Sequence, residues 1–214
     1  MPSIAIVAGA TGLVGRELVR QLGADPTWGE VRALVRRQLP PELAGATVTQ
    51  VQVDYDQLDP PPPWADADHV FCALGTTIRQ AGSQAAFREV DLKYPVALAR
   101  AALARGARHF LLVSAVGADP GSRVFYNRVK GEVEVAIAAL GFRSVTIARP
   151  SLLLGPRPEP RLGEQVGKML GLLAPPRWRP VPAARVARAL VDAAKAGLAG
   201  LRVIENRELR AARG

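Results

Sequence analysis

The chain has 214 residues, of which 49% are hydrophobic and 22% are charged. This length and composition fit one globular domain and exclude a chain that is mainly disordered. Lysine and arginine total 28 against 19 acidic residues, so the formal net charge is +9, which leaves nucleic acid, an acidic membrane or an anionic ligand open as partners.

Short β-branched segments alternate with helical segments along the chain. We predict strands at residues 3–8, 31–35, 47–53, 69–74, 109–114, 144–148 and 201–204. We predict helices at residues 13–22, 85–105, 127–140 and 183–196. Several of the strands are continuously apolar, as in a parallel sheet covered on both faces. The pattern therefore predicts an α/β fold, a Rossmann-type doubly wound parallel sheet.

We expect residues 1–214 to form a single Rossmann-type domain, with residues 150–182 as a small C-terminal substrate-covering lobe. No apolar run is long enough for a membrane-spanning helix, and the apolar N-terminal strand lacks a basic signal region. These features predict a cytoplasmic protein without membrane insertion. The sequence leaves the oligomeric state open.

Cysteine and histidine are rare. The single cysteine, Cys72, excludes an intramolecular disulfide, and its apolar neighbours predict a buried side chain. His69 and His109 are far apart, and with one cysteine they show no metal-ligand spacing, so we expect no metal site. Each histidine precedes an apolar strand, which favours a capping or surface position over catalysis.

A glycine turn directly follows the first predicted strand. Gly9, Gly12 and Gly15 form the pattern G-x-x-G-x-x-G before a helix. Such glycines permit a tight turn, close approach of the backbone to a pyrophosphate, and close packing of helix on strand. The helix N-terminus then offers free N–H groups to the phosphates. The cofactor-binding residues expected in this turn are Gly9, Ala10, Thr11, Gly12, Leu13, Val14 and Gly15.

The end of the second strand indicates which dinucleotide binds. NAD-binding folds place an acid there, on the ribose hydroxyls. Here the positions hold Arg36 and Arg37, with no acid nearby. Two guanidiniums suit a 2′-phosphate, and we therefore predict NADP(H) as the cofactor.

A serine, a tyrosine and a lysine follow in order. Ser114 ends a buried strand, Tyr126 lies twelve residues later, and Lys130 is four residues beyond Tyr126. Positions i and i+4 share one face of a helix, so Tyr126 and Lys130 should point together toward the carboxyl ends of the strands. We interpret Tyr126 as the acid/base, Ser114 as a hydrogen-bond donor to the substrate oxygen, and Lys130 as a cation that also binds the nicotinamide ribose.

These motifs resemble those of the short-chain dehydrogenase/reductase superfamily. Within that superfamily the chain resembles the HIV Tat-interacting protein group, whose members are atypical and bind NADPH. The matching stretches include residues 34–39 (LVRRQL), 53–58 (VDYDQL), 71–77 (FCALGTT), 113–119 (VSAVGAD) and 129–134 (VKGEVE).

The resemblance implies further cofactor contacts. Asp54 would meet the adenine, Pro150 would lie near the nicotinamide, and the fourth strand would end on the adenosine side, at Leu74, Gly75 and Thr76. The chain departs from the superfamily in the helix before Ser114. Many members carry an asparagine there that feeds a water relay, whereas this region reads Val90-Asp91-Leu92-Lys93.

The resulting hypothesis is an NADP(H)-dependent oxidoreductase that moves hydride between the cofactor and a small carbonyl or alcohol substrate. One alternative is a catalytically weak NADP(H)-binding sensor or regulatory protein, which would need the glycine turn but not the Ser–Tyr–Lys set. Another is an epimerase or dehydratase acting on sugar nucleotides, although these enzymes usually have a larger C-terminal lobe. No basic helix or aromatic platform indicates nucleic-acid binding.

Overall fold

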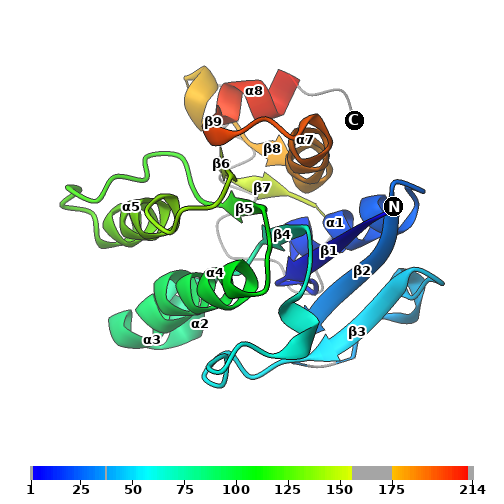
Figure 1. The fold of residues 1–214 in the computed structure, drawn as a ribbon. Helices are drawn as coiled ribbons and strands as arrows, with labels where there is room; N and C mark the ends of the chain where they lie inside the picture. The colour runs from blue at the N-terminus through cyan, green and yellow to red at the C-terminus, as the bar shows by residue number, and fades with distance from the viewer. Residues whose placement is uncertain (1, 37, 156–174, 212–214) are drawn as a thin grey trace.

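The fold is described from a computed structural model, which covers residues 2–36, 38–155 and 175–211. Within these ranges, seven parallel strands form one sheet in the order β3-β2-β1-β4-β5-β6-β9 (Figure 1). The strands are β1 (Ser3–Ala8), β2 (Trp28–Val35), β3 (Val48–Gln52), β4 (His69–Cys72), β5 (His109–Val113), β6 (Ser144–Arg149) and β9 (Gly200–Glu205). The predicted doubly wound parallel sheet is therefore confirmed.

Helices cover both faces of the sheet. They are α1 (Leu13–Gly23), α2 (Ile78–Ala81), α3 (Gln84–Arg88), α4 (Tyr94–Ala104), α5 (Phe125–Ala138), α7 (Ala183–Ala196) and α8 (Asn206–Ala211). Helices α1 and α7 pack together on one face, and α4 and α5 lie on the other (Figure 1). None of the helices in the described part of the chain has the length and apolar character needed to cross a membrane.

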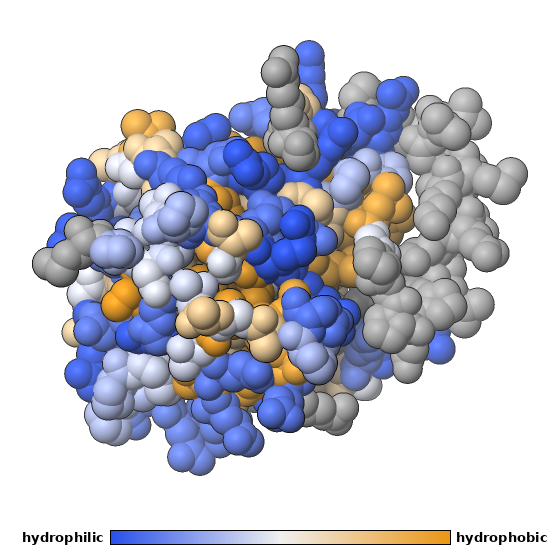
Figure 2. Space-filling model, turned by 90° about the vertical axis from the view of Figure 1, so that its right-hand side faces the viewer, coloured by the Kyte–Doolittle hydropathy of each residue, from blue (hydrophilic) through white to orange (hydrophobic). Residues whose placement is uncertain are grey.

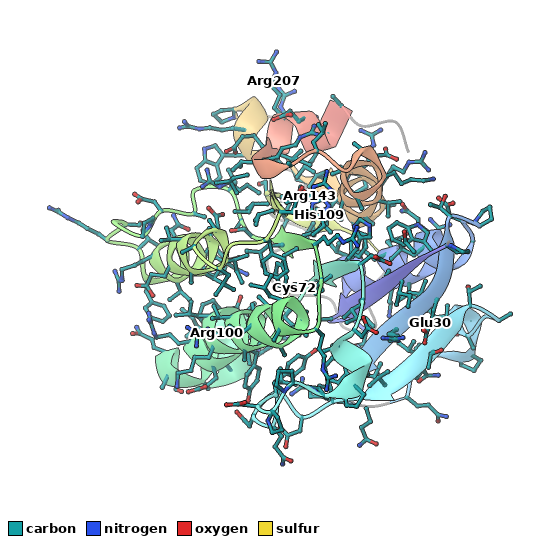
Figure 3. All side chains as sticks on the ribbon, viewed as in Figure 1. Glu30, Cys72, Arg100, His109, Arg143 and Arg207 are labelled. Carbon is teal, nitrogen blue, oxygen red and sulfur yellow. The ribbon has the colours of Figure 1, made fainter. Side chains whose placement is uncertain are left out.

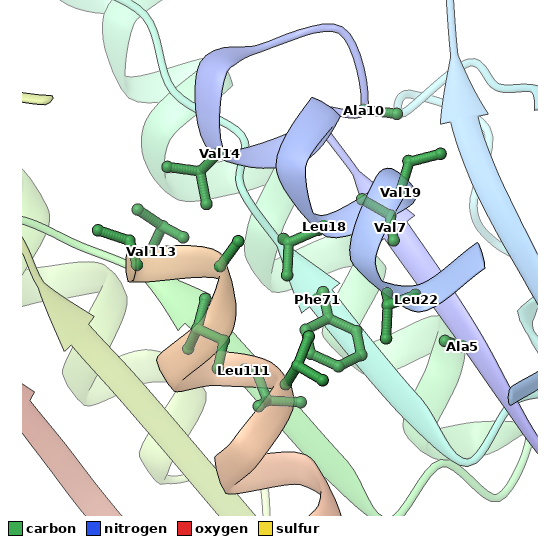
Figure 4. Packing of buried hydrophobic residues seen from close by; sticks show 14 of the residues in the cluster. Ala5, Val7, Ala10, Val14, Leu18, Val19, Leu22, Phe71, Leu111 and Val113 are labelled. Carbon is green, nitrogen blue, oxygen red and sulfur yellow. The ribbon is translucent and has the colours of Figure 1, made fainter. Parts of the chain in front are cut away.

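The sheet separates two hydrophobic layers. On the α1 and α7 side, Leu18 and Leu22 lie near Phe71 of β4 and Leu111 of β5, and all four side chains are fully buried (Figure 4). Burial of each such side chain contributes about 2 kcal/mol. On the face shown in Figure 2, hydrophilic side chains predominate and apolar residues lie between them. Cys72 is buried, as predicted, in the second layer, on the α4 and α5 side of the sheet. Arg207 projects outward from α8 (Figure 3).

The helix predicted over residues 85–105 is wrong in one respect. A π-helical turn, Glu89–Lys93, separates α3 from α4. Pro95 lies in the first turn of α4. Proline has no N–H and its ring crowds the preceding turn, so it fits the first turn of a helix better than the interior. The π turn, which is wider than an α-helical turn, places Asp91 in the buried interior.

The expected capping or surface position of the histidines is also wrong for His109. His109 is 3% exposed, and its Nε2 lies 2.9 Å from Thr146 Oγ1. The rings of His69 and His109 lie 5.5 Å apart, and the Trp28 ring contacts His69 edge-on. Both histidines begin strands, at the end of the sheet opposite the predicted site. They form part of the packing there.

Residues 150–182 are described only in part. On either side of residues 156–174, which lie outside the described ranges, β7 (Leu153–Leu154) pairs with β8 (Val181–Pro182). A 3-10 turn at Pro176–Trp178 precedes β8. The substrate-covering lobe therefore stays a prediction.

Candidate functional site

The strand order reverses between β1 and β4, because β1 is followed by β2 on one side of the sheet and lies beside β4 on the other. Loops leaving the carboxyl ends of strands on either side of such a reversal diverge and leave a crevice, the usual ligand position in open α/β sheets. The loops after β1, β4, β5 and β6 carry most of the residues predicted to form the site.

The glycine turn is shaped by close backbone approach. Gly9 has a φ of +78°, and a Cβ there would lie 2.5 Å from the Ala73 carbonyl oxygen. A Cβ at Gly15 would lie 2.0 Å from the Gly9 carbonyl oxygen. The turn is closed by the Gly12 N–H, which donates to the Gly9 oxygen at 2.9 Å. Side chains at Gly9 or Gly15 would push α1 and the β4 loop away from β1.

Helix α1 starts directly behind this turn. Its N-cap is Gly12, without a side-chain cap, and its first turn carries no acidic residue. The first N–H groups of a helix have no partner within it, and they carry partial positive charge. Ala10 and Val14 point into the core, so they can offer only backbone groups. Thr11 is exposed and Leu13 half-buried. This end of α1 can hold phosphate groups.

Arg36 follows β2 and is exposed. It lines an open cavity of about 450 Å³ together with Val35, Gln38, Gln50 and Gln52. This lining contains no acidic side chain among the described residues. One guanidinium with amide neighbours suits an anion such as a ribose 2′-phosphate. Arg37 lies outside the described residues.

Asp54 lies on the loop that follows β3 and is exposed. One of its carboxylate oxygens accepts from the Asp56 N–H and the other from Gln57 Nε2, both at 3.0 Å. The carboxylate therefore shapes its own loop, and its remaining acceptor sites face solvent. The adenine contact that the resemblance implies for Asp54 stays a prediction.

Ser114 comes directly after β5 and is 5% exposed. Its N–H donates to the Ala148 carbonyl at 2.8 Å, which ties it to β6. Its Oγ is buried without a hydrogen-bond partner among the described residues. Buried hydroxyls are seldom left unpaired. Nearby, the carbonyl of buried Pro150 accepts from Val116 N at 2.9 Å, which links the loops after β5 and β6.

Tyr126 and Lys130 lie on α5, as predicted, although the helix begins at Phe125 and not at 127. Tyr126 is half-buried, with its ring 5.7 Å from that of Phe87. Lys130 is 5% exposed. Its Nζ lies 2.8 Å from Asp91 Oδ1 in the π turn. Burial lowers the pKa of Lys130, but the Asp91 and Tyr126 charges more than offset it, so the net pKa shift is upward.

Asp91 is a functional candidate that the sequence marks only as a departure from the superfamily. Its other oxygen, Oδ2, accepts from the Thr76 N–H at 2.8 Å. A Cβ at Gly75 would lie 3.5 Å from Asp91 Oδ1 and 3.8 Å from Lys130 Nζ. The loop after β4, including half-buried Leu74, therefore lies against the ion pair. The sequence does hold one signal for it, because Asp91 is an acid on the otherwise apolar face of the predicted helix.

Trp178 and Asn206 were also missed. A Cβ at Gly117, three residues after Ser114, would lie 3.4 Å from Trp178 Cη2. The Trp178 carbonyl accepts from Ser151 Oγ at 2.7 Å. The buried Asn206 amide accepts from Ser151 N at 2.9 Å and donates to the carbonyls on both sides of Trp178, those of Arg177 and Arg179. No sequence motif marks these contacts.

The site fits a nicotinamide dinucleotide on two observations. The glycine turn forms a cradle that side chains would fill, at the N-terminus of α1. Farther along the same sheet edge, the Ser114 hydroxyl is buried at the end of β5 with no hydrogen-bond partner in the described part of the chain. A family model described as NAD(P)H-binding matches residues 9–197, and the chain belongs to this family.

The relatives agree with the resemblance found in the sequence. The chain is 34% identical over 209 residues to Protein HTATIP2 of Rattus norvegicus, which covers 95% of this chain and 86% of the relative. It is 36% identical over 221 residues to Protein FMP52, mitochondrial, of Coccidioides immitis, which covers 94% of this chain and 88% of the relative. The predicted membership of the atypical short-chain dehydrogenase/reductase group is confirmed.

Solved structures share the fold. A complex of MoeE5 with UDP-glucose and NAD has a TM-score of 0.70 at 17% identity, covering 97% of this chain and 79% of that protein. The human epimerase family protein SDR39U1 with NADPH has a TM-score of 0.65 at 18% identity, covering 96% and 77%. One neighbour holds NAD and the other NADPH, so the fold accommodates either dinucleotide.

The expected cytoplasmic location is contradicted. Relatives from Coccidioides immitis, Eremothecium gossypii, Candida albicans and Saccharomyces cerevisiae are all named as mitochondrial proteins. The sequence inference was wrong because it tested only for a secretory signal and a spanning helix, and neither criterion distinguishes cytoplasm from mitochondrion.

Proposed function

We propose that the protein is an NADP(H)-dependent oxidoreductase of the short-chain dehydrogenase/reductase type, acting on a small carbonyl or alcohol. The observation that carries this proposal is the Ser114 hydroxyl, which is buried without a partner among the described residues at the end of β5. The loop after β5 leads to α5, on which Tyr126 and Lys130 share one face. A donor reserved for a substrate oxygen explains a buried hydroxyl that makes no hydrogen bond to any described residue.

Preference for NADP(H) is supported by the end of β2. Arg36 faces a cavity lined by amides, with no carboxylate among its described lining residues to repel a 2′-phosphate or to bind ribose hydroxyls. The glycine turn and the N-terminus of α1 would hold the pyrophosphate. Lys130, close to the loop after β4, would bind the nicotinamide ribose, and Pro150 would border the nicotinamide.

The proposed reaction is the reduction of a carbonyl to an alcohol, or the reverse oxidation. A bound nicotinamide dinucleotide supplies the hydride that reduces a carbonyl and accepts the hydride of an alcohol. In reduction, Tyr126 donates its phenolic proton to the carbonyl oxygen, which becomes a hydroxyl, while Ser114 donates a hydrogen bond to the same oxygen. The Lys130 ammonium stabilises the negative charge left on Tyr126. In oxidation, Tyr126 takes the proton back.

The test is turnover of NADPH with a panel of aldehydes, ketones and quinones, comparing wild type with Tyr126→Phe. Tyr55→Phe is the matched control, because the buried Tyr55 hydroxyl also has no partner among the described residues but belongs to a loop after β3. We expect turnover to fall at least about 100-fold in Tyr126→Phe and to persist in Tyr55→Phe. Turnover that survives Tyr126→Phe refutes the catalytic assignment. Cofactor binding without turnover on any substrate favours the sensor or regulatory alternative.

A further inference from the structure

Asp91 is a buried acid whose two oxygens have separate partners. Asp91 is 1% exposed and lies in the π turn between α3 and α4. Oδ1 lies 2.8 Å from Lys130 Nζ, and Oδ2 accepts from the Thr76 N–H at 2.8 Å. These partners belong to two different parts of the site, namely α5 and the loop after β4. One carboxylate therefore joins them.

We propose that Asp91 is the positioning residue of this site, with a buried carboxylate that holds the Lys130 ammonium in its charged form and fixes it to the Gly75–Thr76 loop. The inference rests on the proposed function for its consequence in turnover. The ion pair itself, however, can be tested without a substrate. It also gives Asp91, which lies in the region where many superfamily members carry an asparagine, a role that an amide cannot fill, since an amide cannot pair with an ammonium as an anion.

The environment of Lys130 makes the carboxylate necessary. A lysine this deeply buried favours its neutral form unless an opposite charge is close. The titratable groups that act on Lys130 are Asp91 from the π turn, Tyr126 from its own helix and Cys72 from β4. Burial raises the pKa of the Cys72 thiol to about 12, so Cys72 is neutral at physiological pH. Asp91 is the carboxyl group in this set, and its Oδ1 lies 2.8 Å from Lys130 Nζ.

The π turn explains how Asp91 reaches this position. A regular helix from α3 into α4 would rotate the following residues differently, because a π turn adds one residue to the ring closed by each hydrogen bond. The neighbouring acid of the same turn, Glu89, instead points to solvent and pairs with exposed Lys93 at 2.5 Å. The two acids thus make ion pairs of opposite character, one buried and one exposed. Glu89 therefore provides a matched control.

The direct test is the titration of Lys130 by NMR with lysine labelled at Cε. The chain has only four lysines, Lys93, Lys130, Lys168 and Lys195, so the signals are few, and Lys130→Arg identifies the one in question. In wild type we expect Lys130 to stay protonated up to at least about pH 10. In Asp91→Asn, which keeps the shape and an oxygen for Thr76, we expect its midpoint to fall by about two pH units or more. In Glu89→Gln we expect the wild-type midpoint.

The titration can contradict the proposed role of Asp91 in two ways. An unchanged Lys130 midpoint in Asp91→Asn overturns it. If Asp91→Asn does not fold, wild type alone is sufficient, because a Lys130 midpoint well below that of an ordinary lysine also overturns it. The pH profile of turnover is the second readout. Asp91→Asn should lose activity on the alkaline side where wild type does not. Absence of turnover in every variant would refute the proposed function and leave the result of the Lys130 titration standing.

Discussion

The glycine turn permits a prediction that separates packing from cofactor binding. A Cβ at Gly15 would lie 2.0 Å from the Gly9 carbonyl oxygen, so Gly15→Ala forces α1 away from β1. Leu18 and Leu22 of α1 are fully buried and resist that movement. Overpacking of this kind costs up to about 3 kcal/mol, and the better helix propensity of alanine offsets about 1 kcal/mol. We therefore expect the free energy of unfolding to fall by about 2 kcal/mol.

Gly12→Ala is the matched comparison. Its Cβ would lie 3.3 Å from the same Gly9 oxygen, a contact that a small shift relieves. We expect the free energy of unfolding to change by less than about 1 kcal/mol, whereas the added methyl group at the start of α1 should weaken NADPH binding at least about tenfold by obstructing the pyrophosphate. Urea unfolding and NADPH fluorescence titration measure the two effects. Wild-type stability of Gly15→Ala refutes the packing argument, and wild-type NADPH affinity of Gly12→Ala refutes the placement of the pyrophosphate.

Three further predictions concern charge. Arg36→Ala should weaken NADPH binding about tenfold, the value of one charge-assisted hydrogen bond at an exposed position, and leave NADH binding unchanged; equal losses for both cofactors, or the same loss in the distant exposed control Arg100→Ala, would contradict it. Burial next to His69 lowers the pKa of His109 to about 4, so the unfolded chain binds the proton more readily, and stability present above about pH 6.5 should be lost toward pH 4, by about 2 kcal/mol. Urea unfolding at several pH values should show a shallower loss in His109→Gln, and an unchanged pH dependence would refute the assignment. Arg149 forms a two-point ion pair with buried Glu134, at 3.1 and 2.6 Å; Arg149→Ala should cost about 3 kcal/mol in thermal or urea unfolding, and the double variant with Glu134→Ala should lose less than the sum of both, so strict additivity would argue against the pair.

Most of the fold could be predicted because its determinants are local. Buried parallel strands are short and apolar, and the helices between them have long apolar faces, so the alternation is visible in the sequence. The first strand was predicted with its observed bounds, and so was the helix over residues 183–196, whereas the short helix α8 was not predicted. The π turn at Glu89–Lys93 was not predicted, since it changes one hydrogen-bond register within a segment of uniformly helical composition.

The site residues likewise fall into those that local spacing predicts and those that only the packing brings together. The glycine turn and the Tyr126–Lys130 pair have fixed spacing within one element, so their placement follows from local geometry. Asp91 contacts Lys130 only through packing of two helices far apart in sequence, and Asn206 contacts Ser151 across 55 residues. The hydrophobic periodicity of the sequence does not predict such long-range contacts.

The structure shows which of the arginines are paired with acids and which could bind an anion. Arg36 faces a cavity suited to an anion, whereas Arg149 is engaged by Glu134 and Glu205 within the protein. Arg20 and Arg188 pair with acids on the surface of their own helices. Ion pairs of this kind are neutral, so the net charge of +9 lies on cations outside them, such as those at the predicted phosphate site.

The most direct test of the proposed oxidoreductase is a crystal structure of the protein with NADPH. We predict the pyrophosphate at the glycine turn, the 2′-phosphate on Arg36, the nicotinamide ribose on Lys130, and the nicotinamide ring facing Ser114 and Tyr126 across a space for one carbonyl group. A nicotinamide that lies away from Tyr126, or a 2′-phosphate that does not contact Arg36, would contradict it.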